Sequence, residues 1–200
     1  PSLAARTEPS PALFVDGEAA EYGDRDANRA LELYRRIADS KDAATRAAAL
    51  LRIGRVLRNA GQADDALAVY REMARTGDAP LLGAPAELVA RHAELELLVR
   101  LGRTEEARRL AQAVLDDLGV GRWRITRGQY EHYVESVSEI AHLAAPPGLA
   151  LATARAVWDH FHEWHARPTP QGRALYPADR PTVLVVWRGS ADPLGAWVVE

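Results

Sequence analysis

The segment "WDHFHEWH", which begins at residue 158, holds three histidines within two helical turns. Imidazole is a common zinc ligand, so His160, His162 and His165 are the first residues to consider for chemistry. Two histidines on one helix can bind the same ion when they are four residues apart, but these three are separated by two, three and five. A helix would therefore spread the rings around its circumference, and we predict no metal site and no cofactor. We interpret these side chains as partly exposed or as lying at the edge of the core.

No other pattern in the sequence is typical of a catalytic site. A phosphate-binding glycine loop follows a strand, whereas "GVGRWR" at 119 to 124 follows a segment with a helical pattern. A nucleophile elbow and a pair of carboxylates at a catalytic spacing do not occur. The acidic pair Glu105 and Glu106 begins a predicted helix, where negative charge favours the helix dipole. We therefore predict no catalytic residues and no enzymatic activity for this chain.

The composition argues against several further classes of protein. Of the 200 residues 48% are hydrophobic, which is enough for a sizeable core. The net charge of −3 does not supply the positive field that holds a nucleic-acid backbone. There is no cysteine, so disulfides, thiolate metal sites and cysteine nucleophiles are excluded. No apolar run reaches the roughly 18 residues that span a bilayer. Because the chain starts at Pro1 without a signal peptide, we expect it to be a piece of a longer protein.

The elements of the chain are revealed by a phrase that occurs three times. The segments "RDANRALELYRRIA" at 25 to 38, "GQADDALAVYREMA" at 61 to 74 and "GRTEEARRLAQAVL" at 102 to 115 place small and apolar residues at matching offsets. In each segment these residues fall on one face of a helix. A second helical pattern precedes the middle phrase, at 44 to 61, and the first phrase follows a shorter one near Phe14 to Tyr22. Each unit is therefore predicted to be a helical hairpin.

The recurring residues predict how each hairpin packs. A small residue, Ala30, Ala66 or Ala107, allows two helices to approach closely. A large residue four positions later, Tyr34 or Tyr70, fills the space against the neighbouring unit. We therefore expect helix pairs and no sheet over residues 14 to 118, with Ala66 buried.

This pattern resembles the tetratricopeptide repeat (TPR), a helix-turn-helix unit of 34 residues. In the middle copy Leu50 stands where the family usually has Trp, and the third copy has Leu95 and Ala111 where the family has Gly and an aromatic residue. The structural repeat signature comprises Ala30, Tyr34, Gly54, Gly61, Ala66, Tyr70 and Ala107. The resemblance implies a mainly α fold, a TPR-like antiparallel helical-hairpin solenoid with two extra C-terminal helices and a small terminal β-hairpin.

The TPR resemblance also implies a ligand or peptide groove along the first helix of each unit. At the family's groove offsets this sequence has Arg55, Arg58, Asn59, His92, Glu96 and Arg100. This polar, partly basic surface is able to bind an acidic peptide end or a small carboxylate, although a solvated helix face explains the same residues equally well. The carboxylate clamp of some TPR proteins has Asn where Arg55 lies here, so that activity is not carried over.

The last eighty residues lack the repeat. Thr126 and Gln129 predict a capping box, with Ile125 and Tyr130 as a hydrophobic staple, at the start of a helix. "APPG" at 145 to 148 separates this helix from another, and Val183 to Trp187 and Ala196 to Val199 are predicted strands. Five tryptophans are interpreted as core packing, with a ligand-lining cluster as the alternative: Trp123, Trp158, Trp164, Trp187 and Trp197. Trp158, Trp164 and Trp187 are expected to join the last helix to the strands.

The expected organisation comprises a linker or disordered start over residues 1–13, three TPR-like helical hairpins over 14–120, a capping helix pair over 121–168 and a small β element over 169–200 that leads toward a membrane segment. The segments "LLGAPAELVARHAELELL", "GRWRITRGQYEHYVESV" and "PTVLVVWRGSADPLGAWVVE" make the chain resemble the extracytoplasmic sensor region of a group of bacterial membrane histidine kinases. That resemblance implies a non-catalytic, periplasmic input domain between two transmembrane helices of an inner-membrane protein. It also implies an unidentified small ligand or protein partner, no nucleic acid, and a homodimer as an open alternative.

Two other classes of protein fit the repeats. A TPR adaptor that binds partner peptides, with a cytoplasmic location, is the first alternative, and it predicts a gene without flanking apolar segments of roughly 20 residues. A helical regulatory domain of a transcription activator is the second.

Overall fold

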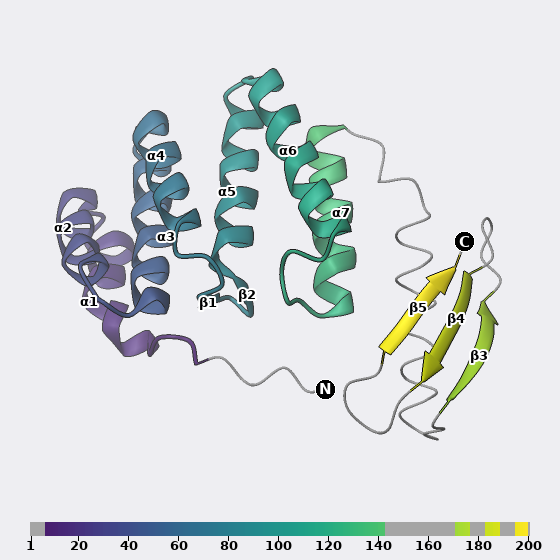
Figure 1. Cartoon of the computed structure of the whole chain (residues 1–200). Helices are drawn as coiled ribbons and strands as arrows, with labels where there is room; N and C mark the ends of the chain where they lie inside the picture. Colours follow the sequence, from purple (N-terminus) through teal and green to yellow (C-terminus); the bar gives the residue numbers. More distant parts are fainter. Residues whose placement is uncertain (1–6, 143–170, 177–182, 189–194, 200) are drawn as a thin grey trace. The chain divides into compact units, whose positions relative to one another are not determined.

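The computed structural model describes residues 7–142, 171–176, 183–188 and 195–199. The chain divides into two compact units, Pro1–Leu143 and Ala144–Glu200, and each is considered by itself. The first unit is helical and the second contains a small antiparallel sheet, so the protein is mainly α with a minor β part (Figure 1).

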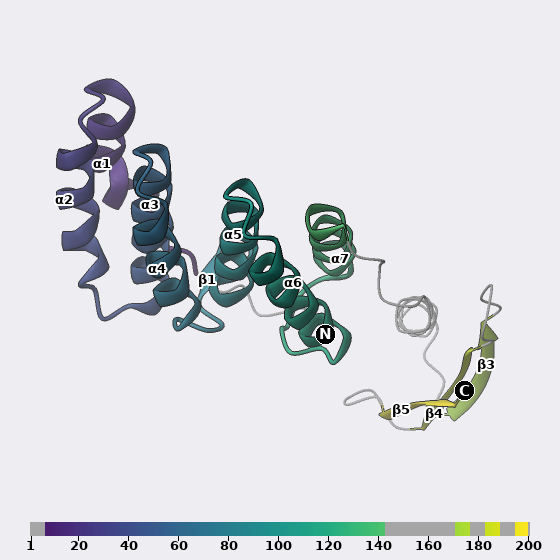
Figure 2. The ribbon, with the colours of Figure 1, turned by 90° about the horizontal axis from the view of Figure 1, so that it is seen from above.

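The helices of the first unit follow one another in chain order. A short helical segment is composed of η1 (Pro11–Phe14), α1 (Val15–Glu18) and η2 (Ala19–Gly23), as expected near Phe14 to Tyr22. The longer helices are α2 (Ala27–Ala38), α3 (Ala43–Asn59), α4 (Ala63–Ala74), α5 (Ala86–Arg100), α6 (Thr104–Gly119) and α7 (Arg127–Ala141). Each of these packs on the next, and α5 also contacts α3 and α7. Seen from above, α4 and α6 lie in one layer and α3, α5 and α7 in the other (Figure 2).

Side-chain caps and left-handed turns set the ends of these helices. Asp26 accepts a hydrogen bond from the Arg29 amide at the start of α2, and Asp42 caps α3 in the same way through the Thr45 amide. Thr126 and Gln129 form the predicted capping box of α7. The backbone of Gly61, between α3 and α4, has a φ of +79°, which explains why glycine occurs there.

The first two helix pairs interlock through a glycine and a tyrosine. The backbone of Gly17 lies against the ring of Tyr34, and Gly54 lies against Tyr70 so closely that a Cβ atom on either glycine would overlap the ring. Both tyrosines are buried, which confirms the predicted role of this residue in filling the space between helices. The predicted contact positions Ala30, Ala66 and Ala107 are likewise buried.

The third pair reverses the sizes of these residues. Leu95 of α5 occupies the place of the glycine, Ala111 of α6 occupies the place of the tyrosine, and both are fully buried. A large side chain on the first helix opposite a small one on the second conserves the packed volume. The two departures from the repeat pattern are therefore opposite in side-chain size, and both positions stay buried.

The expectation of no strand between residues 14 and 118 was wrong. Pro80–Leu81 (β1) and Ala84–Pro85 (β2) pair as two-residue antiparallel strands in the connection between α4 and α5. Leu82 and Gly83 form the turn with positive φ values of 51° and 76°. The Gly83 carbonyl accepts a hydrogen bond of 2.6 Å from the side chain of Gln129, so this turn is tied to the first turn of α7.

The described part of the second unit contains three strands where the sequence predicted a two-stranded hairpin. Gln171–Tyr176 (β3) pairs with Val183–Arg188 (β4), which pairs with Gly195–Val199 (β5), all antiparallel. β4 and β5 match the predicted strands, whereas β3 was missed because "QGRALY" lacks β-branched residues and a regular alternation. Its pairing along six residues of β4 supplies what its local propensity does not.

Candidate ligand-binding face

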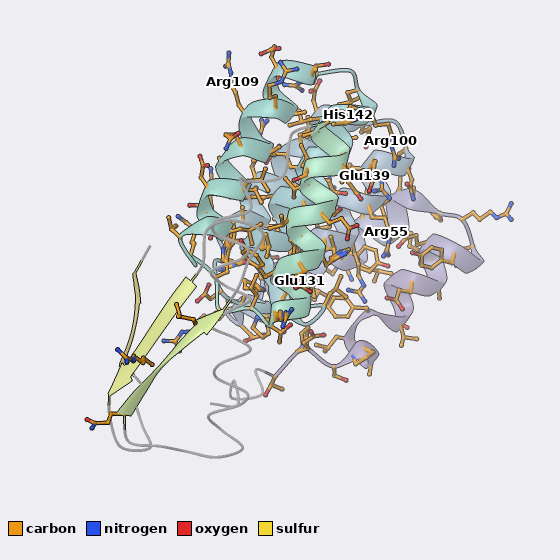
Figure 3. The ribbon with its side chains drawn as sticks, turned by 90° about the vertical axis from the view of Figure 1, so that its right-hand side faces the viewer. Arg55, Arg100, Arg109, Glu131, Glu139 and His142 are labelled. Carbon is orange, nitrogen blue, oxygen red and sulfur yellow. The ribbon has the colours of Figure 1, made fainter. Side chains whose placement is uncertain are left out.

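The predicted groove residues lie on one face of the helical unit. Arg55, Arg58 and Asn59 belong to α3, whereas His92, Glu96 and Arg100 belong to α5. We call the surface formed by these two helices together with α7 the α3/α5/α7 face. Figure 3 shows Arg55 and Arg100 on this side of the molecule together with Glu139 of α7, whereas Arg109 of α6 lies on the other side.

Arg55 is already committed to a contact within the protein. Its Nε and Nη2 atoms donate to the two carboxylate oxygens of Glu21 at 2.8 and 2.7 Å. The hydroxyl of Tyr34 donates to the same carboxylate at 2.9 Å. Burial alone would raise the pKa of Glu21, but the hydrogen bonds from Arg55 and Tyr34 lower it below its ordinary value. Arg55 therefore joins the first two helix pairs, and its charge is balanced.

Arg58, by contrast, forms no ion pair with any described residue. Its Nε atom is completely covered by protein and has no hydrogen-bond acceptor among the described residues. Burial raises the pKa of the neighbouring Tyr70; Arg58, Arg55 and Arg100 act to lower that pKa, and Glu96 acts to raise it. These four charged groups therefore act on one point, the tyrosine hydroxyl, although they come from two helices.

Asn59 belongs to a neighbouring open pocket of about 230 Å³. The pocket is lined by Glu21, Tyr22, Arg25, Ala27, Val56, Asn59 and Ala60. The guanidinium carbon of Arg55 lies 5.3 Å from the centre of the Tyr22 ring at its border. The pocket therefore adjoins the Glu21 and Arg55 contact between the first two helix pairs.

His92 lies in a contact between α5 and α7 that the sequence did not reveal. Its Nε2 atom is 2.7 Å from the hydroxyl oxygen of Ser136, and its ring meets that of Tyr133 edge to face. Its Nδ1 atom is 3.9 Å from Glu96. Burial lowers the pKa of His92, and His132 lowers it further, whereas Glu96 acts in the opposite direction. The neutral imidazole is therefore favoured, and it orients α7 against α5.

Ser136 is the residue of this face that the sequence analysis missed. It stands 44 residues from His92, and a lone serine in a helix gives no local signal. Only the contact between α5 and α7 brings the two side chains together.

Where α4, α5 and α6 meet, by contrast, the charged groups are paired. Arg71 contacts the buried carboxylate of Glu94 at 2.6 Å. Arg103 contacts Asp64 at 3.0 Å and Glu106 at 2.7 Å. The first pair links α4 to α5, the second links α4 to the start of α6, and the third lies within the first turn of α6. Besides the Nε atom of Arg58, the hydroxyl of Ser138 on α7 is a covered group without a hydrogen-bond partner among the described residues.

Trp123 confirms the prediction of core packing for the one tryptophan whose surroundings are described. It is buried, its indole Nε1 donates to Glu87 at 3.1 Å, and Arg91 and Arg122 lie over its ring at 5.7 and 5.9 Å from the centroid. The predicted junction of Trp158, Trp164 and Trp187 and the three histidines at 160, 162 and 165 lie outside the described side chains. Those interpretations stay predictions.

Comparison of the chain with models of protein families, with curated proteins and with solved structures finds no match. None of the described helices combines the length and the apolar character that crossing a membrane requires. The α3/α5/α7 face is therefore the candidate functional site of the described residues.

Proposed function

We propose that this chain is the non-catalytic signal-input domain of a bacterial membrane sensor histidine kinase, located outside the cytoplasm. Its helix pairs form a TPR-like solenoid, and the α3/α5/α7 face binds a small ligand or a partner protein. The solenoid is supported by the Gly17–Tyr34 and Gly54–Tyr70 contacts and by the buried pair Leu95 and Ala111. The sensor assignment is supported by the resemblance of three sequence segments to such regions.

One observation carries the binding role of this face. Among the half-buried arginines of the helical unit, Arg52, Arg55 and Arg91 form ion pairs, whereas Arg58 has no hydrogen bond or ion pair with any described residue and its Nε atom is covered by protein. Holding an arginine against the protein without an acceptor is unfavourable, and stability alone does not explain it. A function in binding does.

The test of the sensor assignment is the location of the full-length gene product. An antibody against this domain is used to follow the full-length protein through cell fractionation. Recovery in the membrane fraction, with the domain accessible to protease added to spheroplasts, is the expected result. Recovery in the supernatant after ultracentrifugation would contradict it and favour an adaptor.

A TPR-like adaptor that binds partner peptides is the second candidate, and one observation favours it. Val99 and Leu101 flank Arg100 at the end of α5, and both are exposed, at 39% and 42%. Apolar side chains beside a cation suit a peptide with an acidic and an apolar residue. Both candidates use the same face, so a binding measurement does not separate them. The fractionation experiment does, because they differ in cellular location.

A further inference from the structure

The connection between α4 and α5 is longer than the stacking of helix pairs requires. Residues 39–42 are enough to join α2 to α3, whereas residues 75–85 lie between α4 and α5. The additional residues form the β1/β2 hairpin, which lies at the end of the helical unit where α5 begins (Figure 1). Leu81 and Ala84 of this hairpin are buried, so its base is anchored to the core. The hairpin is therefore an addition to the repeat, and the repeat itself does not explain it.

The tip of this hairpin is bound by two segments that are distant in the sequence. The Gly83 amide donates a hydrogen bond of 2.5 Å to the carboxylate of Glu8, which stands 75 residues earlier. The Gly83 carbonyl accepts a hydrogen bond of 2.6 Å from the Nε2 atom of Gln129, which stands 46 residues later. One residue thus joins residues 7–10, which we call the N-terminal segment, to α7.

The hydrogen bonds continue from Gln129 into the cap of α7. The Oε1 atom of Gln129 accepts from the Thr126 amide at 2.9 Å, and the Tyr130 amide donates to the Thr126 carbonyl at 2.9 Å. A side-chain amide that is bound at both its oxygen and its nitrogen has a fixed orientation. A displacement of the Gly83 turn therefore acts on the first turn of α7 through Gln129.

The backbone of the turn is strained. A two-residue hairpin loop with positive φ at both positions corresponds to a type I′ turn, in which Asn-Gly is the favoured sequence. Here the first position is Leu82, which has a φ of 51° and is 70% exposed. A leucine disfavours this left-handed conformation and gains little from burial at such a position. The conformation therefore depends on the hydrogen bonds to Glu8 and Gln129, and loss of either bond favours a rearrangement of the turn.

We propose that the Leu82–Gly83 turn couples the N-terminal segment to α7, so that the bond between Glu8 and the turn and the arrangement of α7 on α5 stabilise each other. α7 borders the α3/α5/α7 face and contacts α5 through Ser136 and His92. A ligand that binds one arrangement of α7 more tightly therefore changes how strongly Glu8 is held, and the reverse effect has the same magnitude. This inference rests on the proposed signal-input function and identifies a path for the signal inside the helical unit.

Amide hydrogen exchange of the purified 200-residue chain tests the coupling. Glu8→Ala removes the carboxylate that binds the turn, and it is expected to accelerate exchange of the Tyr130 amide on α7 at least about threefold. Asp16→Ala is the matched control, because it removes another exposed carboxylate, on α1. The control is expected to leave exchange of the Tyr130 amide unchanged.

Gln129 tests the coupling in the reverse direction. Gln129→Ala leaves both partners of the bond between Glu8 and Gly83 in place, yet it is expected to accelerate exchange of the Gly83 amide at least about threefold. Glu8→Ala and Gln129→Ala are then combined in a double-mutant cycle. Their joint effect on the unfolding equilibrium constant is expected to differ from the product of the single effects by about twofold or more.

The role of the turn itself is tested at its strained position. Leu82→Asn supplies the residue that a type I′ turn favours, and it is expected to slow exchange of the Gly83 amide about threefold. Leu101→Asn makes the same substitution at an exposed leucine in the turn between α5 and α6. This control is expected to leave exchange of the Gly83 amide unchanged.

Three outcomes would overturn the inference. Equal exchange of the Tyr130 amide in Glu8→Ala and Asp16→Ala would show that the N-terminal segment does not act on α7. Independent effects in the double-mutant cycle would show that the two bonds of Gly83 are not coupled. Exchange of the Gly83 amide that is unaffected by Leu82→Asn would show that the turn is not the coupling element. All these variants change exposed or half-buried side chains, so the buried core is retained. These outcomes leave the sensor assignment standing, because the location of the full-length protein tests it separately.

Discussion

The first and second helix pairs have the same steric interface and opposite electrostatics. In both, a glycine on the first helix receives the ring of a tyrosine on the second: Gly17 with Tyr34 and Gly54 with Tyr70. Beside the first tyrosine a buried carboxylate is held by Arg55. Beside the second lies the half-buried Arg58, whose covered Nε atom has no acceptor among the described residues. The comparison shows that the same packing recurs in both pairs, while the charge pairing of the adjoining polar position differs.

The third pair shows that even the steric part is a constraint on volume and not on residue type. Leu95 and Ala111 invert the small and large partners, and both are fully buried. A core tolerates such an exchange when total volume is conserved. The following three predictions test this comparison, from the largest expected effect to the smallest.

The largest effect is expected from truncating the tyrosine of the second pair. Tyr70→Ala should lower the free energy of unfolding by about 3 to 5 kcal/mol, the range for removing a buried aromatic ring. Adding Gly54→Leu to this variant reproduces the arrangement of Leu95 and Ala111 and should restore part of the loss. Denaturant unfolding of the single and double variants gives the two values.

Gly54→Leu alone is the control for that cycle. It should destabilise the protein, because a side chain at this position overlaps the intact Tyr70 ring. If the two substitutions proved additive, with no coupling between them, the interlocking of glycine and tyrosine would be contradicted.

An intermediate effect is expected from removing the carboxylate of the first pair. Glu21→Gln should cost about 1 to 3 kcal/mol, because it leaves the donors of Arg55 and Tyr34 without a charged acceptor. The matched variant Glu96→Gln on α5 should change stability by less than about 0.5 kcal/mol, since the carboxylate of Glu96 accepts no hydrogen bond from the described residues. Thermal unfolding of both variants tests whether the carboxylate of Glu21 stabilises the protein more than that of Glu96; equal losses would contradict this difference.

The smallest effect concerns the dependence of stability on pH. The pKa of His92 is lowered by burial, so the unfolded chain takes up a proton near the ordinary pKa of 6.5 before the folded chain does. Stability from this residue is therefore complete above about pH 6.5 and falls as the pH is lowered. The pKa of Glu21 is also lowered, so its contribution is complete above its ordinary value of 4.5 and is lost as the pH falls through the lower folded pKa.

The two windows are separated by variants. His92→Gln should flatten the stability profile just below pH 6.5, and Glu21→Gln should flatten it below pH 4.5. Unfolding free energies measured from pH 8 to pH 3.5 provide the check. A wild-type profile that is flat between pH 6.5 and pH 5 would show that the contact of His92 with α7 does not favour the neutral ring.

The sequence by itself determined the elements whose signals are local. Alanine and tyrosine at a spacing of four residues predicted the second helix of the first two pairs, and Thr126 with Gln129 predicted the start of α7. The groove residues were placed on the correct helices by the resemblance, because a helix fixes which positions share a face. The local sequence pattern did not predict β3, because its residues have little intrinsic preference for a strand. β3 is paired along β4, a contact that a local pattern does not reveal.

The tertiary structure alone decided which of these residues are partners. Arg55 and Arg58 lie three residues apart on one helix and look alike in the sequence, yet one is held by Glu21, 34 residues away, and the other has no acceptor among the described residues. Ser136 meets His92 across 44 residues, and Leu95 is matched by Ala111 on the next helix. Helical periodicity is a property of neighbours in the chain, whereas burial and charge pairing depend on which helices pack together. That difference is why the sequence placed both arginines on one helix, whereas only the fold distinguished the paired arginine from the one whose Nε atom has no acceptor among the described residues.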